Sequence, residues 1–309
     1  MQVPLSFGAM SKRRGSGRNP DPVSEKAAAE FDIASRVDDP ITDLDRLRRS
    51  LLFAELSMLS YLADEEAQPV FNGLGFTSVQ YLERDGAQAY VLGTDTDLIV
   101  VCRGTEPNEW NDIKADANAL TDVAETVGRV HRGFKREVDD VWPEVSAALD
   151  GEERVVWFCG HSLGGAMATI CAGRSEFSDA TATAAEVHTF GSPRVGTKRY
   201  IQHASVQHVR WVNNNDIVTR VPPRWLGYGH TGTRMYLDRN GEVARLTKAR
   251  RGRDRWSGFW DGLKQRKFDH FSDHASAGYV AHIRRAVDDG VVIASDRPSI
   301  FARLRNRPI

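Results

Sequence analysis

A serine lies at the centre of a motif whose residue types suit nucleophilic chemistry. The motif is Gly160-His161-Ser162-Leu163-Gly164, which follows an apolar run at 155–159 and precedes a small-residue run at 165–172. These flanks predict a buried strand before the serine and a closely packed helix after it. The N-terminus of that helix would direct free N–H groups toward charge developing at the hydroxyl. The amide of Leu163 is therefore one predicted oxyanion donor.

The turn between this strand and helix must be very tight, which limits the size of the residues around the serine. Strand and helix nearly touch two positions before and two positions after the nucleophile. Gly160 and Gly164 occupy those two positions, and glycine is the residue that tolerates such close backbone approach.

A serine hydroxyl needs a base, and the base needs a carboxylate to orient it. In this arrangement the chain order is serine, acid, histidine. Asp216 follows a predicted strand at 207–212 and lies in a polar turn, so it is the leading acid. Asp238 is the reserve candidate, although it has the character of a hairpin-turn residue.

Three histidines after Asp216 could serve as the base: His230, His270 and His274. His270 and His274 both fall in the segment before the last predicted helix, and each follows an aspartate. The pattern alone leaves the choice between these two open.

Strands and helices alternate along much of the chain, which predicts an α/β fold with a mostly parallel central sheet and helices on both faces. One predicted strand, 97–103, ends in Arg103-Gly104-Thr105, which delivers a hydroxyl residue to the strand end where α/β active sites form. The expected elements are helices at 42–62 (with Thr42 as N-cap), 135–149, 165–172 and 197–205, a last helix from about 272, and strands at 76–82, 87–92, 97–103, 155–159, 185–190, 207–212 and 233–237.

Composition bounds the class of protein. The chain has 309 residues, 41% hydrophobic and 27% charged, with a formal net charge of −1, so bulk charge indicates no polyanionic partner such as nucleic acid. Its three cysteines lie in apolar runs and fit a reducing compartment. With no run long enough to span a bilayer and no secretory signal pattern, a cytoplasmic protein is expected.

The chain is expected to form one domain. Residues 1–40 mix Ser, Gly, Arg, Pro and Asp and predict a flexible tail. No linker or repeat follows, so 41–309 is predicted to be a single domain.

Several motifs in order resemble the fungal-type (class 3) lipase family over roughly residues 45 to 285. Beside the serine motif, they are Ala54-Glu55-Leu56-Ser57, Arg103-Gly104-Thr105, His131-Arg132-Gly133-Phe134, Phe190-Gly191-Ser192-Pro193-Arg194-Val195-Gly196, Val212-Asn213-Asn214-Asn215-Asp216 with Pro222-Pro223, and Asp273-His274 ahead of Tyr279.

This resemblance implies an α/β-hydrolase fold and hydrolysis of carboxylic esters of lipids, classically acylglycerols, without a cofactor or metal. Ser162 matches the nucleophile, Asp216 the acid and His274 the base, with the spacing to Tyr279 favouring His274. Thr105 matches the first oxyanion donor and Leu163 the second. In the family the next segment, here 106–114, is a lid, and the sequence leaves its mobility open.

Two rival functions remain open, one enzymatic and one non-enzymatic. A basic, tryptophan-bearing segment at 243–268 suits contact with an anionic membrane surface, which would favour a phospholipase or lysophospholipase using the same triad. The second rival is a catalytically idle lipid-binding module, against which the complete set of site residues speaks. Nucleic-acid binding is disfavoured by the single short basic run.

Overall fold

A mixed eight-stranded sheet forms the centre of the molecule in the computed structural model, which describes residues 32–104, 120–177, 182–244 and 274–293. The strand order is β1-β2-β3-β6-β7-β9-β11-β12. The bounds are β1 Ser78–Arg84, β2 Ala87–Gly93, β3 Asp97–Cys102, β6 Val155–His161, β7 Ala184–Phe190, β9 Gln207–Asn213, β11 Thr233–Leu237 and β12 Val243–Ala244.

The five central strands, β3-β6-β7-β9-β11, run parallel, whereas β1, β2 and β12 pair antiparallel at the edges. The expected mostly parallel sheet is therefore confirmed. The run from Leu98 to Cys102 in β3 is apolar because helices cover both faces of the sheet, whereas β7 and β9 also bury polar side chains such as His188 and Arg210. The carboxyl ends of parallel strands lie on the same side of the sheet, so the segments that follow β3, β6, β7 and β9 meet there.

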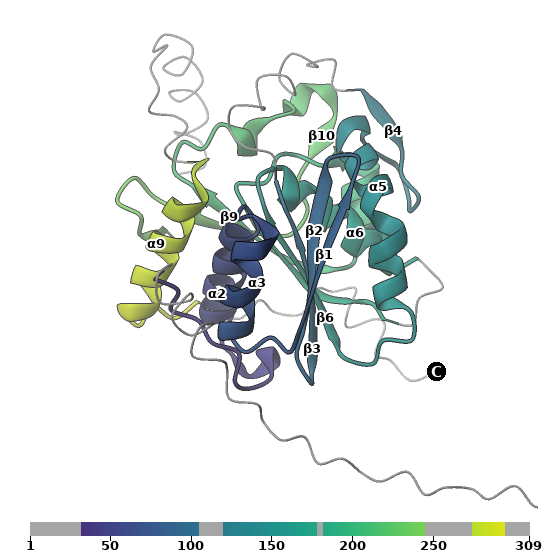
Figure 1. Cartoon of the computed structure of the whole chain (residues 1–309). Helices are drawn as coiled ribbons and strands as arrows, with labels where there is room; N and C mark the ends of the chain where they lie inside the picture. The colour runs from purple at the N-terminus through teal and green to yellow at the C-terminus, as the bar shows by residue number, and fades with distance from the viewer. Residues whose placement is uncertain (1–31, 105–119, 178–181, 245–273, 294–309) are drawn as a thin grey trace, which may run out of the picture.

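Helices α2 (Arg46–Leu59), α3 (Asp64–Gly73) and α9 (Ser276–Asp288) lie on one face of the sheet (Figure 1). Helices α5 (Arg132–Leu149) and α6 (Leu163–Ser175) cover the other. Two hydrophobic cores result, one on each face. None of the helices in the described ranges is long and apolar enough to cross a membrane.

The first helix begins later than its sequence pattern suggests. Residues Ile41–Asp43 form a separate 3-10 turn, and α2 starts at Arg46 with Asp45 as its N-cap. The Asp45 carboxylate accepts hydrogen bonds from the amides of Leu47 and Arg48 at 2.9 and 3.0 Å. A carboxylate there satisfies two free N–H groups of the first turn, which the predicted cap, Thr42, cannot reach.

A small second sheet, absent from the sequence expectation, has the order β10-β8-β5-β4. Its strands are β4 Thr121–Val123, β5 Arg129–His131, β8 Gly196–Thr197 and β10 Tyr228–Gly229. Strands of two or three residues carry no measurable alternation of polar and apolar positions, so no sequence pattern indicates them.

The packed part of the chain starts before residue 41, which corrects the tail expected through residue 40. The Glu55 carboxylate on α2 accepts hydrogen bonds from the amides of Ala34 and Ser35 at 2.9 and 3.0 Å. Val37 is buried, and its amide donates to the Leu74 carbonyl at 2.8 Å. Buried backbone and an apolar side chain fix this segment to the domain. Residues 1–31 lie outside the described residues.

Candidate active site

Ser162 occupies the turn between β6 and α6 in a conformation that L-residues rarely adopt. Its φ is 58° and its ψ is −127°. The Ser162 amide donates to the Phe190 carbonyl at the end of β7 at 2.9 Å, which fixes the turn against the neighbouring strand. Backbone strain of this kind, of order 1–3 kcal/mol, persists only where the surroundings hold it. Leu163 is the first residue of α6, so its amide is one of the free N–H groups at the helix start.

The two glycines of the motif are required by close backbone contacts. A Cβ on Gly164 would lie 2.1 Å from the Cys102 carbonyl oxygen, and one on Gly160 would lie 2.4 Å from the Gly164 backbone. Strand β6 and helix α6 therefore approach each other, and β3, too closely for any side chain at these positions, as the sequence indicated.

The structure brings together three side chains that lie far apart in the sequence. His274 Nε2 lies 2.8 Å from Ser162 Oγ, and His274 Nδ1 lies 3.0 Å from Asp216 Oδ2. All three side chains are buried. Ser162 follows β6, Asp216 follows β9, and His274 lies just before α9. At these distances the imidazole can take the proton of the hydroxyl, while the carboxylate orients the ring and stabilises the imidazolium that forms.

The Asp216 carboxylate is held on both oxygens. Oδ2 accepts the Tyr279 hydroxyl at 2.6 Å as well as His274, and Oδ1 accepts the Val218 amide at 2.9 Å. Burial, followed by the negative charge of Asp216, raises the pKa of Tyr279 well above its usual value, so this hydroxyl remains a donor. In the sequence, the position of Tyr279 served only to favour His274 as the base. Its hydrogen bond to the acid is visible only in the structure.

His161, the residue before the nucleophile, touches the base rather than solvent. Its Nε2 lies 2.6 Å from the His274 carbonyl oxygen and its Nδ1 lies 3.0 Å from the Tyr61 hydroxyl. Burial, followed by the proximity of His274, lowers the pKa of His161 well below its usual value, so the ring is neutral. A carbonyl can only accept, so the single ring proton sits on Nε2 and Nδ1 accepts from Tyr61.

The remaining sequence candidates fall elsewhere. The Asp238 carboxylate accepts the amides of Asn240 and Glu242 within the turn between β11 and β12, as its hairpin character suggested. His230 Nε2 lies 2.8 Å from the Thr219 carbonyl oxygen. Thr105 and His270 lie outside the described residues, as do 106–114 and 245–268.

All three cysteines are free and buried. They lie on three elements that flank the serine turn: Cys102 ends β3, Cys159 lies on β6, and Cys171 lies on α6. Burial raises the pKa of Cys159 to about 12, and contact with Cys171 together with burial raises that of Cys102. These thiols are therefore core residues rather than nucleophiles.

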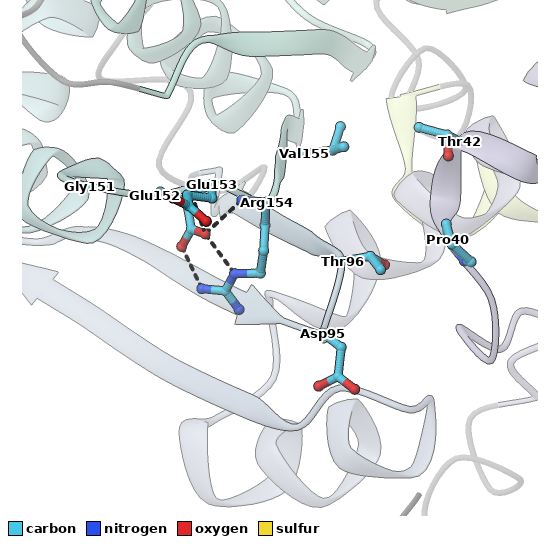
Figure 2. Close-up of a pocket in the computed structure, with 9 residues that line it drawn as sticks. All are labelled: Pro40, Thr42, Asp95, Thr96, Gly151, Glu152, Glu153, Arg154 and Val155. Carbon is cyan, nitrogen blue, oxygen red and sulfur yellow. Dashed lines mark hydrogen bonds and ion pairs between the residues drawn. The ribbon is translucent and has the colours of Figure 1, made fainter. Parts of the chain in front are cut away.

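A surface pocket, whose lining residues Figure 2 shows, lies at the N-terminal ends of β3 and β6, whereas Ser162 follows the C-terminal end of β6. Asp95 and Thr96 precede β3 and Arg154 precedes β6, so about 20 Å of strand separates this pocket from the serine. Figure 2 shows Arg154 bridged to Glu152, with Nη2–Oε2 at 2.6 Å. That carboxylate neutralises the pocket's arginine. Among the described residues, no cluster of His, Cys, Asp and Glu could hold a metal ion.

The sheet, the strained serine turn and the order of the three side chains define an α/β-hydrolase fold. The triacylglyceride lipase of Rhizomucor miehei has a TM-score of 0.55 to this chain at 22% identity, covering 63% of this chain and 81% of that one. At this level of identity the likeness establishes the fold alone, and it confirms the fold expected from the sequence.

The sequence model described as lipase (class 3) matches residues 99–225, which confirms the resemblance of this chain to the class 3 lipase family. Toxin TseL of Vibrio cholerae is 25% identical over 215 residues, 54% of this chain and 33% of that protein. The secreted mono- and diacylglycerol lipase 1 of Fusarium solani is 32% identical over 166 residues, 50% of this chain and 49% of that protein. The chain thus matches about a third to a half of the length of these curated relatives.

Proposed function

We propose that this protein is a serine hydrolase that cleaves carboxylic esters of lipids through an acyl-enzyme. The observation that supports the proposal best is the hydrogen-bonded line from Ser162 through His274 to Asp216 at the start of a helix. The name of the Fusarium relative, a mono- and diacylglycerol lipase, favours a glyceride ester as the substrate class.

In the proposed mechanism His274 Nε2 takes the proton of Ser162 as Oγ attacks the ester carbonyl. Asp216 orients the imidazole and stabilises the imidazolium that forms. The amide of Leu163, at the positive end of α6, donates to the oxyanion. We assign the other oxyanion donor to Thr105, on the resemblance to the family. His274 then protonates the leaving alcohol, and water activated by the same base hydrolyses the acyl-enzyme.

The test is hydrolysis of p-nitrophenyl esters, from acetate to palmitate, by the wild type and by Ser162→Ala. We expect the variant to lose at least about a thousandfold in kcat. The chain-length profile of the wild type distinguishes an esterase from a lipase. A folded wild type without activity on any ester, and without labelling by a fluorophosphonate, would overturn the proposal in favour of a lipid-binding module.

Two further points remain proposals. Peripheral membrane contact through 243–268 is proposed from its Arg, Lys and Trp content, since 245–268 lie outside the described residues. A cytoplasmic location is proposed from the three unpaired cysteines, although the names of several relatives describe secreted proteins. Fractionation of cells with antibody to the chain separates these outcomes.

A further inference from the structure

Arg210 is a buried cation on the face of the sheet opposite to α2 and α9. It lies on β9 between Thr189 of β7 and Arg234 of β11, and neighbours in register on parallel strands point to the same face. The side chain is 7% exposed, and its Nε is buried without a hydrogen-bond acceptor. No carboxylate of the described ranges forms an ion pair with it.

A second arginine reaches the same face from the segment after β7. Arg194 donates through Nη1 to the carbonyl oxygens of Arg220 and Pro222, the latter at 2.7 Å, and its amide donates to Val221 at 2.7 Å. Its Nε is also buried without an acceptor. These bonds hold the 220–222 segment next to Arg194, and Arg224 follows that segment.

The surroundings of these two arginines are cationic. Burial, followed by the positive charges of Arg234, Arg194 and Arg224, lowers the pKa of Arg210 to about 9. Burial, followed by Arg224 and Arg220, lowers the pKa of Arg194 to about 10. The formal net charge of the whole chain is −1, so this is a local concentration of positive charge rather than a general property.

The two nearby histidines, His208 and His230, neither add to the positive charge nor compensate it. His208 Nε2 lies 2.8 Å from Thr189 Oγ1, and burial lowers the pKa of His208 to about 3. His230, which contacts the Thr219 carbonyl, also has a pKa lowered by burial and then by Arg210. Both rings are therefore neutral.

A buried guanidinium that has no anionic partner and lies near other cations destabilises the folded protein. The same uncompensated charge is what makes the removal of one partner of a buried ion pair strongly destabilising. An anion with several acceptor oxygens relieves it, because guanidinium groups bind phosphate through short, charge-assisted hydrogen bonds. An exposed lysine or arginine would not need an anionic partner, because water already solvates its charge.

The surface beside the cluster suits a lipid. The 3-10 turn Arg224–Leu226 carries an exposed arginine next to Trp225, which is 82% exposed, and Leu226, which is 39% exposed. Arginine beside an exposed indole is the combination that meets phosphate headgroups at a membrane interface.

We propose that Arg210 and Arg194, with the exposed Arg224 of the neighbouring 3-10 turn, form a binding site for a phosphate group, carried either by a lipid headgroup or by free phosphate. Arg210 lies on β9, Arg194 in the segment after β7 and Arg224 in the 3-10 turn, and none of the three belongs to the proposed triad. Binding at this site does not depend on ester hydrolysis.

Calorimetric titration of the full chain with inorganic phosphate, at matched chloride ionic strength, tests the first source. Flotation with phosphatidylcholine vesicles, with and without phosphatidic acid, tests the second, in the Ser162→Ala background so that lipid is not consumed. Each is measured for Arg210→Met, for the exposed Arg224→Gln, and for the control Arg84→Gln at the far end of β1.

We expect Arg210→Met to weaken phosphate or vesicle binding by at least about tenfold, Arg224→Gln to weaken it severalfold, and Arg84→Gln to leave it unchanged. Arginine-dependent binding of phosphate alone identifies the free anion, and arginine-dependent binding of phosphatidic acid vesicles identifies the headgroup. Binding of neither probe by the wild type, or an equal loss in Arg84→Gln, overturns the proposal. If Arg210→Met does not fold, Arg224→Gln alone decides.

Discussion

The hydroxyl of Tyr279 lies 2.6 Å from Asp216 Oδ2, the same oxygen that lies 3.0 Å from His274 Nδ1. Tyr279, one turn into α9, and His274, the proposed base, therefore bind the same carboxylate oxygen of Asp216. The Tyr279 oxygen also accepts the Asn213 amide at 2.9 Å, so it fixes the end of β9 and the carboxylate together.

Tyr279→Phe removes this donor and leaves the aromatic packing intact. We expect kcat/KM on a short ester to fall roughly ten- to a hundredfold, since a hydrogen bond to a charged group contributes about 1.5–3 kcal/mol. The acidic limb of the pH–rate profile should move to higher pH, because the less solvated Asp216 favours the imidazolium. Tyr81→Phe, which removes a hydroxyl bonded to exposed Glu83, is the control. An unchanged profile in Tyr279→Phe would mean that the phenol only packs.

Acid should destabilise this fold through four histidines, the buried His161, His188 and His208 and the half-buried His230. Burial lowers the pKa of each in the folded protein. Above pH 6.5 both states are neutral; below it the unfolded chain binds protons that the folded chain does not. The free energy of unfolding therefore decreases as the pH is lowered below 6.5, by up to about 1.4 kcal/mol per pH unit for each histidine.

Urea unfolding between pH 7.5 and 5 measures this slope. His208→Gln is expected to make the slope shallower by about one histidine's share, whereas His203→Gln, at an exposed position, is expected to leave it unchanged. A stability that does not vary across this range would contradict the burial of the four rings as neutral groups.

Gly164→Ala tests the close approach of α6 to β3. A Cβ there would meet the Cys102 carbonyl oxygen at 2.1 Å, so we expect a loss of at least about 2 kcal/mol in unfolding free energy and loss of ester hydrolysis. Gly86→Ala separates this clash from backbone strain: its φ is +92° with nothing within 4 Å. That variant should lose about 1 kcal/mol and keep full activity. Equal effects of the two changes on activity would count against the geometry of the turn.

The segment at 32–40 should contribute to stability. A chain that starts at residue 41 loses the buried Val37 and the two amides that donate to Glu55, while Glu55 Oε1 remains paired with Arg284 at 3.0 Å. We expect it to be about 3 kcal/mol less stable than a chain that starts at residue 32, by urea unfolding. Equal stabilities would restore the boundary at residue 41.

The sequence predicted the serine turn and the leading acid because each depends on local chemistry. Strand, small residues and helix flank Ser162, and a polar turn follows the strand before Asp216. The choice of His274 over His270 needed the resemblance to a family. Chain distance explains this: 112 positions separate His274 from Ser162, and no local pattern spans such a gap.

The contacts that the sequence did not reveal are those between elements. Neither the bond from His161 to the His274 carbonyl nor the one from Tyr279 to Asp216 follows from residue spacing, because each depends on how α9 and the residues before it pack against the sheet. Helix α3 was missed as well, since Pro69 within it lowers its helical propensity. Tertiary packing overrides that local preference.

The three buried thiols make the region around Ser162 measurable without any substrate. Cys102, Cys159 and Cys171 lie on β3, β6 and α6, the elements that flank the serine turn, and have no exposed surface. A thiol reagent therefore reacts only when β3, β6 and α6 separate, so the labelling rate under native conditions records how often this region opens. The chain thus contains its own probe of local opening, and a bound inhibitor at Ser162 should slow that reaction.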